Sequence, residues 1–268
     1  MPPSTRSEVH FDERFNLFRR MLSDLGTPLN PSMTLMDFGC GEGHLVQAAL
    51  SQGLDAYGCD LYDVKYSTDW NSPAITGELR KEGRVRAILD PYRLPFEDSC
   101  MDVVISDQVF EHVLDYPQAI AELHRIMRPG GVFLHSFPSR YRCIEGHIFV
   151  PMTSMFRARW WLWLWAALGI RNEFQVGLPV AEVVERNAQF LESGTLYLTP
   201  GRIKREFSRH FSSVEYVERV FLPYSKRPRR LGNVPFGAQI YGLLWNRLLY
   251  GKRAAVPLDS RESQPRAA

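Results

Sequence analysis

The chain has 268 residues, which is enough for one large domain to bury a full core without disulfide bonds. Hydrophobic residues make up 45% and charged residues 23%, as in average soluble globular proteins, so disordered, collagen-like and coiled-coil classes are excluded. The net charge of +2 is uneven: residues 1–150 carry 14 Lys and Arg against 21 Asp and Glu, whereas residues 151–268 carry 18 against 9. The acidic half cannot be a nucleic-acid arm, and the basic half suits phosphates, anionic lipid or the acidic half itself.

The cysteines indicate a reduced setting. All four are widely spaced, with neither a C-x-x-C pair nor the ligand spacing of a zinc site: Cys40, Cys59, Cys100 and Cys143. We therefore expect no metal and a cytoplasmic location. Residues 1–15 lack the apolar stretch of a secretory signal. The longest apolar run, residues 160–170, falls short of the roughly 20 residues that cross a bilayer, so we expect no transmembrane helix.

A helix is expected within residues 1–32, because Phe11, Phe15, Phe18 and Leu22 recur at helical spacing. Residues 33–137 then alternate between the two kinds of regular structure. The expected strands are 33–38, 55–60, 84–89, 102–107 and 131–137, and the expected helices are 43–52, 71–82 and 116–127. This alternation predicts an α/β fold with an open, mostly parallel sheet, helices on both faces and ligands beyond the carboxyl ends of the strands.

The alternation stops after Phe137, and about 60 residues pass before the next clear element. Because so long an insertion is rarely a bare loop, we expect residues 138–200 to form a lid that selects the substrate. Residues 201–222 predict a helix and a strand that return to the core. Residues 223–268 read as a basic, aromatic tail, more helical than extended, which leaves the last strand of such a sheet unplaced.

A glycine-rich turn carries the strongest chemical signal. The apolar run 35–38 leads into Gly39, Gly41 and Gly43 and then into a helix. Glycines allow a tight turn and close approach to a ligand, and a helix N-terminus offers N–H donors to negative groups. The dinucleotide pattern G-x-G-x-x-G would need glycine where His44 stands, which weighs against NAD.

Asp60 ends the second expected strand, 17 residues after Gly43. A carboxylate there can accept hydrogen bonds from both hydroxyls of a ribose. The turn and Asp60 together indicate a nucleoside ligand without identifying it.

Several motifs in order resemble one family. They are DFGCGEG (37–43), CD (59–60), LD (89–90), LPFED (94–98), DVVISD (102–107), EHV (111–113) and LHRIMRPGG (123–131). From about Leu35 to Phe137 the chain resembles class I S-adenosylmethionine-dependent methyltransferases, in the broad group that includes the ubiquinone-biosynthesis C-methyltransferases.

The resemblance implies S-adenosylmethionine as the cofactor and gives roles to individual residues. Gly39, Gly41 and Gly43 would hold its methionine portion, and Asp37 would support their loop. Asp60 would bind the ribose. The remaining implied cofactor residues are Asp90 near the adenine amino group, Asp107 and Gln108 beside the sulfonium, and their neighbours Cys40, Leu61 and Pro91.

Such a site transfers a methyl group by in-line displacement, and a base is needed only where the nucleophile must lose a proton. Similar N-methyltransferases that act on amides and nucleobases have a motif with two prolines at this place. Residues 107–110 lack these prolines, so an amide or nucleobase acceptor is disfavoured. The candidate bases are His112 and His147, with Glu145 to orient His147; each could equally be structural. His135 alternates within a strand and is assigned to the core.

The acceptor is expected to be a small molecule or a lipid- or sugar-linked intermediate, methylated on oxygen. The segment from Trp160 to Trp165 suits either an apolar lid or a helix lying on a membrane surface, and the C-terminal tail adds weight to membrane contact. The basic run from Lys226 to Arg230 lacks a recognisable RNA-binding module, so nucleic acid is disfavoured. A non-catalytic binding protein, an RNA methyltransferase and an NAD oxidoreductase remain the alternatives.

Overall fold

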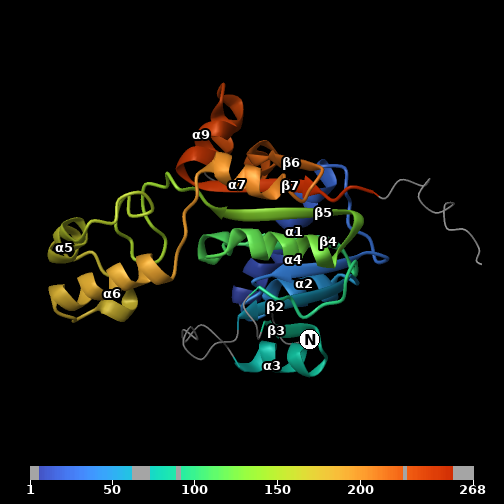
Figure 1. Ribbon diagram of the computed structural model, residues 1–268, viewed down its shortest axis with the longest axis horizontal. Helices are drawn as coiled ribbons and strands as arrows, with labels where there is room; N and C mark the ends of the chain where they lie inside the picture. Colours follow the sequence, from blue (N-terminus) through green and yellow to red (C-terminus); the bar gives the residue numbers. More distant parts are fainter. Residues whose placement is uncertain (1–5, 62–72, 89–91, 226–227, 256–268) are drawn as a thin grey trace, which may run out of the picture.

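A seven-stranded sheet forms the centre of the molecule (Figure 1) in the computed structural model, which describes residues 6–61, 73–88, 92–225 and 228–255. Its strands are β1 (Thr34–Phe38), β2 (Asp55–Leu61), β3 (Val85–Ile88), β4 (Met101–Asp107), β5 (Met127–Pro138), β6 (Ser213–Tyr216) and β7 (Asn246–Lys252), in the spatial order β3-β2-β1-β4-β5-β7-β6. The first five pair in parallel and β7 is antiparallel to both its neighbours. The predicted open, mostly parallel α/β sheet is confirmed.

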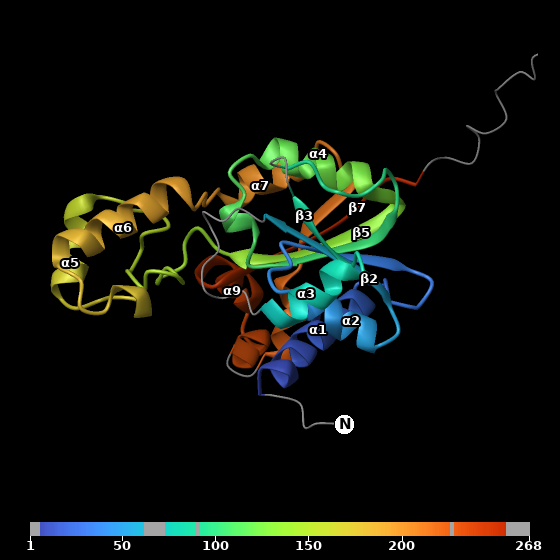
Figure 2. The same ribbon diagram turned by 90° about the horizontal axis from the view of Figure 1, so that it is seen from below.

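Helices cover both faces of this sheet (Figure 2). The α-helices are α1 (Arg6–Asp24), α2 (His44–Ser51), α3 (Pro73–Lys81), α4 (Tyr116–Ile126), α5 (Arg159–Ala167), α6 (Val180–Ser193), α7 (Pro200–Phe207), α8 (Glu218–Phe221) and α9 (Gly237–Leu244). Short 3₁₀ turns are η1 (Phe110–His112), η2 (Glu173–Gln175), η3 (Leu222–Tyr224) and η4 (Pro228–Asn233). Side chains from α4 and α7 form the core on one face, and those from α1, α2 and α3 form it on the other.

The sequence explains the first helix and its packing. Phe15, Phe18 and Leu22 are fully buried on one face of α1, as their spacing predicts. The backbone turns at Gly26, whose φ of +81° favours glycine, and the helix is followed by an extended link to β1. The helix therefore lies firmly against α2, beside the site that β1 begins to build.

The C-terminal part agrees with the sequence interpretation in one respect and differs in another. Residues 201–222 contain the expected helix and strand, as α7 and β6, although the strand is short because the chain then turns into α8, where Glu218 pairs with Arg247 at 2.9 Å. The tail 223–268 contains β7, which lies between β5 and β6 inside the sheet. Leu248 and Leu249 are both buried because both faces of β7 are covered, so the alternation that would reveal a strand is missing.

The segment between β5 and α7 projects from the sheet as a small helical unit (Figures 1 and 2). Its helices α5 and α6 share an apolar cluster of their own, separate from the two clusters of the sheet. Three hydrogen bonds hold the segment that returns from this unit to α7: Leu196 N–H to the Glu111 carbonyl (2.7 Å), His112 Nδ1 to the Gly194 carbonyl (2.8 Å), and Arg140 to the Tyr197 carbonyl (2.5 Å). The unit thus begins and ends beside the carboxyl ends of β4 and β5.

Candidate active site

The carboxyl ends of β1, β2 and β4 bring most of the sequence-predicted cofactor residues together. The strands are parallel neighbours, with Phe38 opposite Cys59 and Asp37 opposite Ile105. The glycine loop leaves β1, Asp60 lies at the end of β2, and Asp107 ends β4. These groups therefore meet at one edge of the sheet, where open α/β folds bind ligands.

The three glycines of the loop differ in what a side chain would meet at each position. All adopt positive φ, at +73° for Gly39, +51° for Gly41 and +82° for Gly43. A Cβ on Gly39 would lie 2.5 Å from the methyl carbons of Val109, and one on Gly43 would lie 2.8 Å from Leu79. A Cβ on Gly41 would meet nothing within 4 Å. Gly39 and Gly43 thus allow close packing below the loop, and Gly41 leaves open the space that a ligand would take.

The carboxylate of Asp60 links the second strand to this loop. One oxygen accepts from the Gly41 N–H and the other from the Leu61 N–H, each at 2.6 Å. Burial raises the pKa of Asp60, although the two backbone hydrogen bonds oppose the rise. Each oxygen keeps a second lone pair, so the carboxylate can still accept hydrogen bonds from ribose hydroxyls.

Asp37 and Cys40 lie beneath the loop and do not point out of it. Burial, and then the carboxylates of Asp107 and Asp60, raise the pKa of Asp37 well above its usual range. Burial likewise raises the pKa of the Cys40 thiol, which packs against Gly58, where a Cβ would lie 2.7 Å from the sulfur. Both side chains are buried, so contact between Cys40 and a ligand would come through its backbone.

The start of α2 completes the cradle. Gly43 occupies the N-cap position and offers no side chain to the first N–H groups of the helix. Leu61 is half-exposed beside Asp60. This arrangement fits S-adenosylmethionine. Its methionine part suits the uncapped N–H groups and the open space at Gly41, and its ribose suits the Asp60 carboxylate. That cofactor supplies a methyl group on a positively charged sulfur.

Asp107 has a partner that the sequence did not reveal. Arg14 on α1 donates to both of its oxygens, from Nε and from a terminal nitrogen, each at 2.5 Å. Although burial opposes it, the Asp107 carboxylate raises the pKa of Arg14. The two residues are 93 positions apart, and Arg14 stands in a helix whose pattern indicates only core packing, so no sequence signal pointed to the pair.

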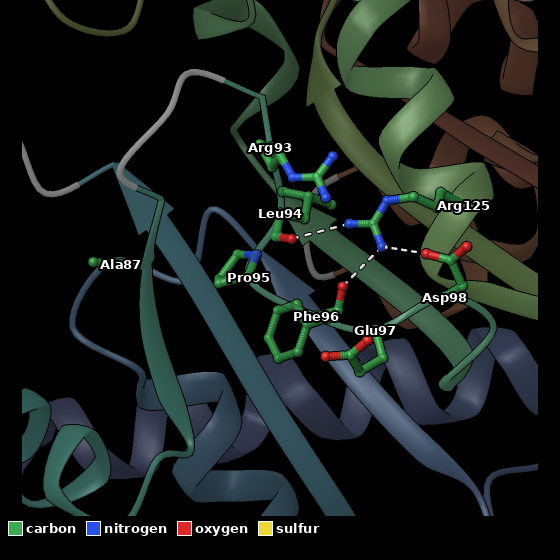
Figure 3. Close-up of a pocket in the computed structure, with 8 residues that line it drawn as sticks. All are labelled: Ala87, Arg93, Leu94, Pro95, Phe96, Glu97, Asp98 and Arg125. Carbon is green, nitrogen blue, oxygen red and sulfur yellow. Dashed lines mark hydrogen bonds and ion pairs between the residues drawn. The ribbon is translucent and has the colours of Figure 1, made fainter.

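Asp90 and Pro91 lie outside the described residues. The loop that follows them, with the LPFED motif, surrounds a cavity of about 360 Å³ (Figure 3). Arg125 of α4 donates to the carbonyl oxygens of Leu94 and Phe96 and to the Asp98 carboxylate. These hydrogen bonds from Arg125 shape the loop and so explain the motif. None of the predicted site residues lines the cavity.

The structure brings together the three candidate catalytic residues, His112, His147 and Glu145. The His112 and His147 rings meet edge to face, with centroids 4.9 Å apart. Glu145 is buried, and its Oε1 accepts from His147 Nδ1 and from the Tyr197 hydroxyl, both at 2.8 Å. Its Oε2 accepts from the N–H groups of His147 and Ile148. They lie where the projecting unit joins η1.

These contacts fix the protonation of the cluster. Burial would raise the pKa of Glu145, but hydrogen bonds from His147 and from the backbone lower it to about 2. Because a carboxylate only accepts, His147 carries a proton on Nδ1, and its side chain is 43% exposed. Burial lowers the pKa of His112, which donates through Nδ1 to a carbonyl.

Two other polar residues near this cluster are Glu111, which had no role in the sequence interpretation, and Gln108, which the resemblance assigned to the cofactor. Glu111 is buried, and burial raises its pKa to about 8. Gln108 adopts a φ of +57°, and its amide nitrogen is buried. Glu111 stands within the EHV motif, but nothing in that motif shows that its carboxyl group is buried. His135 is completely buried against Phe133 and Phe110, as its place in a strand predicts.

Comparisons with known proteins agree with the motifs. A family model described as a methyltransferase domain matches residues 10–176. A probable S-adenosylmethionine-dependent methyltransferase of Mycolicibacterium smegmatis is 51% identical over 111 residues, which is 40% of this chain and 38% of that protein. A malonyl-[acyl-carrier protein] O-methyltransferase of Serratia marcescens is 31% identical over 109 residues, 40% of this chain and 39% of that protein. The chain therefore spans about two fifths of these curated relatives.

Among solved structures, geranyl diphosphate C-methyltransferase from Streptomyces coelicolor A3(2) is similar, with a TM-score of 0.49 and 15% identity over 96% of this chain and 86% of that one. The family model covers well over half of the chain and includes the glycine loop, Asp60 and Asp107. This chain belongs to the family of class I S-adenosylmethionine-dependent methyltransferases.

Proposed function

We propose that the protein transfers the methyl group of S-adenosylmethionine to an oxygen atom of a small molecule or of a lipid- or sugar-linked intermediate. The observation that carries this proposal is the pairing of His147 with the buried Glu145, beside His112 and beyond the end of the sheet. A histidine that carries a proton on one ring nitrogen can accept the proton of a hydroxyl group on the other.

Each residue of the cluster has a task in this mechanism. Glu145 fixes the ring of His147 and would stabilise the positive charge that His147 gains when it takes a proton from the acceptor. Tyr197 donates to Glu145 and holds it in place. The depressed pKa of His112 keeps its ring uncharged beside His147, so it does not oppose that gain of charge by repulsion at neutral pH. The projecting unit would exclude water.

Transfer to oxygen also agrees with one relative, since the Serratia marcescens protein is named an O-methyltransferase. Because that relative matches only 40% of this chain, its acceptor is not assigned to this protein. The cysteine pattern supports a cytoplasmic location.

We further propose that the protein touches a membrane surface. Among the described residues, no helix is long and apolar enough to cross a bilayer. Trp160 and Trp163 on α5 nevertheless expose 62% and 56% of their surface, and Leu168, which follows the helix, is exposed too. Phe236, just before α9, and Ile240 within it are also exposed. Such faces suit the boundary between headgroups and acyl chains, where a lipid-linked acceptor would be found.

The function is tested with purified protein, S-adenosylmethionine and fractionated small-molecule and lipid extracts. We expect S-adenosylhomocysteine to accumulate with a fraction that contains the acceptor. His147→Gln should lower turnover about 100-fold or more, because a general base contributes this much, and should leave the affinity for S-adenosylhomocysteine unchanged. His210→Gln, at the ring pair with His124, is the matched control.

Wild-type turnover in His147→Gln would remove His147 as the base. Tight binding of S-adenosylhomocysteine without product from any fraction would instead favour a non-catalytic binding protein.

A further inference from the structure

One turn of α1 makes contacts at both ends of the glycine loop. Phe11 stacks on the ring of His44, with centroids 4.0 Å apart and ring planes 11° from parallel. Three residues further along the helix, Arg14 donates to both oxygens of Asp107. Positions i and i+3 lie on the same side of a helix, so a single turn can make both contacts.

The two contacted residues mark the start and the end of this loop. His44, the first residue of α2, directly follows the last glycine. β1 and β4 pair with Asp37 opposite Ile105. The same register, continued by two residues, sets Gly39 level with Asp107 on strands about 4.8 Å apart. After burial, the Asp107 carboxylate is accordingly the largest cause of the raised pKa of Asp37. The turn of α1 therefore spans the loop from its first glycine to its last.

The methionine end of the cofactor, which suits the same loop, brings two charges to it. That end is a zwitterion, because an ammonium group and a carboxylate share one carbon. The uncapped N–H groups of α2 offer the carboxylate only a partial positive charge. Among the described residues, Arg14 alone of the arginines and lysines hydrogen-bonds to the side chain of a predicted cofactor residue. Arg14 is therefore placed to supply a full positive charge.

The guanidinium of Arg14 is held in place and still has donors to offer. Its Nε and one terminal nitrogen donate to Asp107, and that terminal nitrogen also lies 3.3 Å from Ser136 Oγ. Two parallel bonds to one carboxylate fix the plane of the group. The other terminal nitrogen has no acceptor among the described residues, so its two N–H groups are available to a ligand. The side chain is 25% exposed, so a ligand can reach it.

We infer that Arg14 binds the carboxylate of the cofactor's methionine, and that Asp107 is the positioning residue that holds the guanidinium for it. The first helix is then part of the cofactor site, although its sequence pattern indicates only core packing. Because Arg14 and Asp107 form a pair of opposite charges, they add little net charge, which suits a methionine end that is itself neutral overall. The inference concerns the cofactor and does not depend on which acceptor is methylated.

Two ligands that differ only at this carboxylate test the inference. They are S-adenosylhomocysteine and its primary carboxamide, which has the same shape without the negative charge. Both are titrated by calorimetry into the 268-residue chain at about pH 6.5, where the amino group of each ligand is protonated. We expect S-adenosylhomocysteine to bind at least about tenfold more tightly, since a charge-assisted hydrogen bond contributes more than a neutral one. Equal affinities of the wild type for the two ligands would overturn the inference.

Arg14→Met should reduce this preference to about twofold or less. Arg14→Lys should retain part of it, because lysine keeps the charge but not the planar fork. Arg19→Met is the matched control, since Arg19 lies on the same helix and donates to Gln52 at the far end of α2. A helix that is merely loosened would weaken both ligands alike, so a preference that survives in Arg14→Met also overturns the inference. Thermal unfolding shows whether each variant is folded, and Arg14→Gln, which can still donate to Asp107, takes the place of Arg14→Met if that variant is not.

The sulfonium is the other charged group of the cofactor that the pair could face. It is tested by comparing S-adenosylmethionine with S-adenosylhomocysteine, which differ only in the methyl group and charge on sulfur. We expect Arg14→Met to change both affinities by the same factor, within about twofold. If the variant instead strengthens the binding of S-adenosylmethionine alone and keeps the preference for the carboxylate, the pair faces the sulfonium and the inference fails. Failure of the proposed function has a different signature, namely normal binding of both ligands without methyl transfer to any extract fraction.

Discussion

Asp60 shows how one carboxylate can serve both the fold and a ligand. Its two oxygens hold the backbone of the glycine loop and of the strand end through the N–H groups of Gly41 and Leu61. A ribose bound beside them would use the lone pairs that these bonds leave free. Removing the carboxylate would therefore loosen the loop and, if a ribose binds as proposed, would remove a ligand contact at the same time.

We predict that Asp60→Ala weakens the binding of S-adenosylmethionine by about 1–3 kcal/mol, the usual cost of losing a charged hydrogen-bond partner. Asp55→Ala is the control, because Asp55 lies at the opposite end of the same strand and pairs with Arg84. Calorimetric titration measures both. An unchanged affinity in a folded Asp60→Ala protein would remove Asp60 from the site.

Glu111 makes the stability of the protein depend on pH. The carboxyl group titrates near pH 8 in the folded protein, against about 4.3 in an unfolded chain. Between these values the folded state holds a proton that the unfolded state has released. The contribution of Glu111 to the free energy of unfolding therefore falls as pH rises from about 4.3 to about 8, and it stays constant above that.

We predict that Glu111→Gln removes this dependence. The variant should match the wild type near pH 4.5 and exceed its free energy of unfolding by roughly 2–5 kcal/mol at pH 9. Urea denaturation across this range measures the difference. Glu185→Gln, an exposed partner of Arg159 on the projecting unit, should leave the dependence as it is. Parallel curves for the wild type and Glu111→Gln would show that Glu111 ionises normally.

At the scale of elements, α5 has two different faces. Leu162 and Ala166 are buried against α6, whereas Trp160 and Trp163 point away from the protein. Trp161 takes an intermediate position and donates to the Pro151 carbonyl at 2.8 Å. One face of α5 thus builds the projecting unit, and the other, with Trp160 and Trp163, is exposed.

We predict that the double variant Trp160→Ala/Trp163→Ala binds vesicles of phosphatidylglycerol and phosphatidylcholine at least about fivefold more weakly than the wild type. Binding of such a face strengthens with the apolar area buried at the interface, and both indole rings would be lost from it. Trp245→Ala, at the end of α9, reports the share of the C-terminal segment. Co-sedimentation measures binding, and equal binding by the double variant would exclude α5 as the contact.

The sequence predicted those elements whose own side chains show a period. The first five strands and the helices between them were found because α/β crossovers alternate buried strands with amphipathic helices. β7 was missed because it is covered on both faces and follows an equally apolar helix. The same limit applies to the site. The glycine loop (39–43) and Asp60 could be predicted because each lies in a local motif. Arg14 could not, because it reaches Asp107 only through the packing of α1.

At the scale of the whole molecule, β7 is what joins β6 to the rest of the sheet. It pairs with β5 from Val132 to Pro138, and its second half pairs with all of β6. Arg253, just beyond it, donates to the Gly131 and His124 carbonyls. Without β7, two strands would have unpaired backbone groups along a shared gap.

We therefore predict that a chain ending at residue 245 does not fold. A chain ending at residue 255 should keep the thermal unfolding midpoint of the 268-residue chain within about 4 °C. A shift of that size corresponds to a change of less than about 1–2 kcal/mol in the free energy of unfolding. Circular dichroism and thermal unfolding distinguish the two. A cooperative transition in the shorter chain would show that β5 and β6 can pair with each other or remain unpaired.

The place of β7 also bears on how the protein is made. Synthesis runs from the N-terminus, so the glycine loop and the acidic strand ends exist long before Asn246 leaves the ribosome. Until then one edge of β5 has unpaired backbone N–H and C=O groups, and any newly made strand nearby could pair with it. Synthesis of β7, rather than production of the cofactor-binding half, is thus the step that completes the sheet.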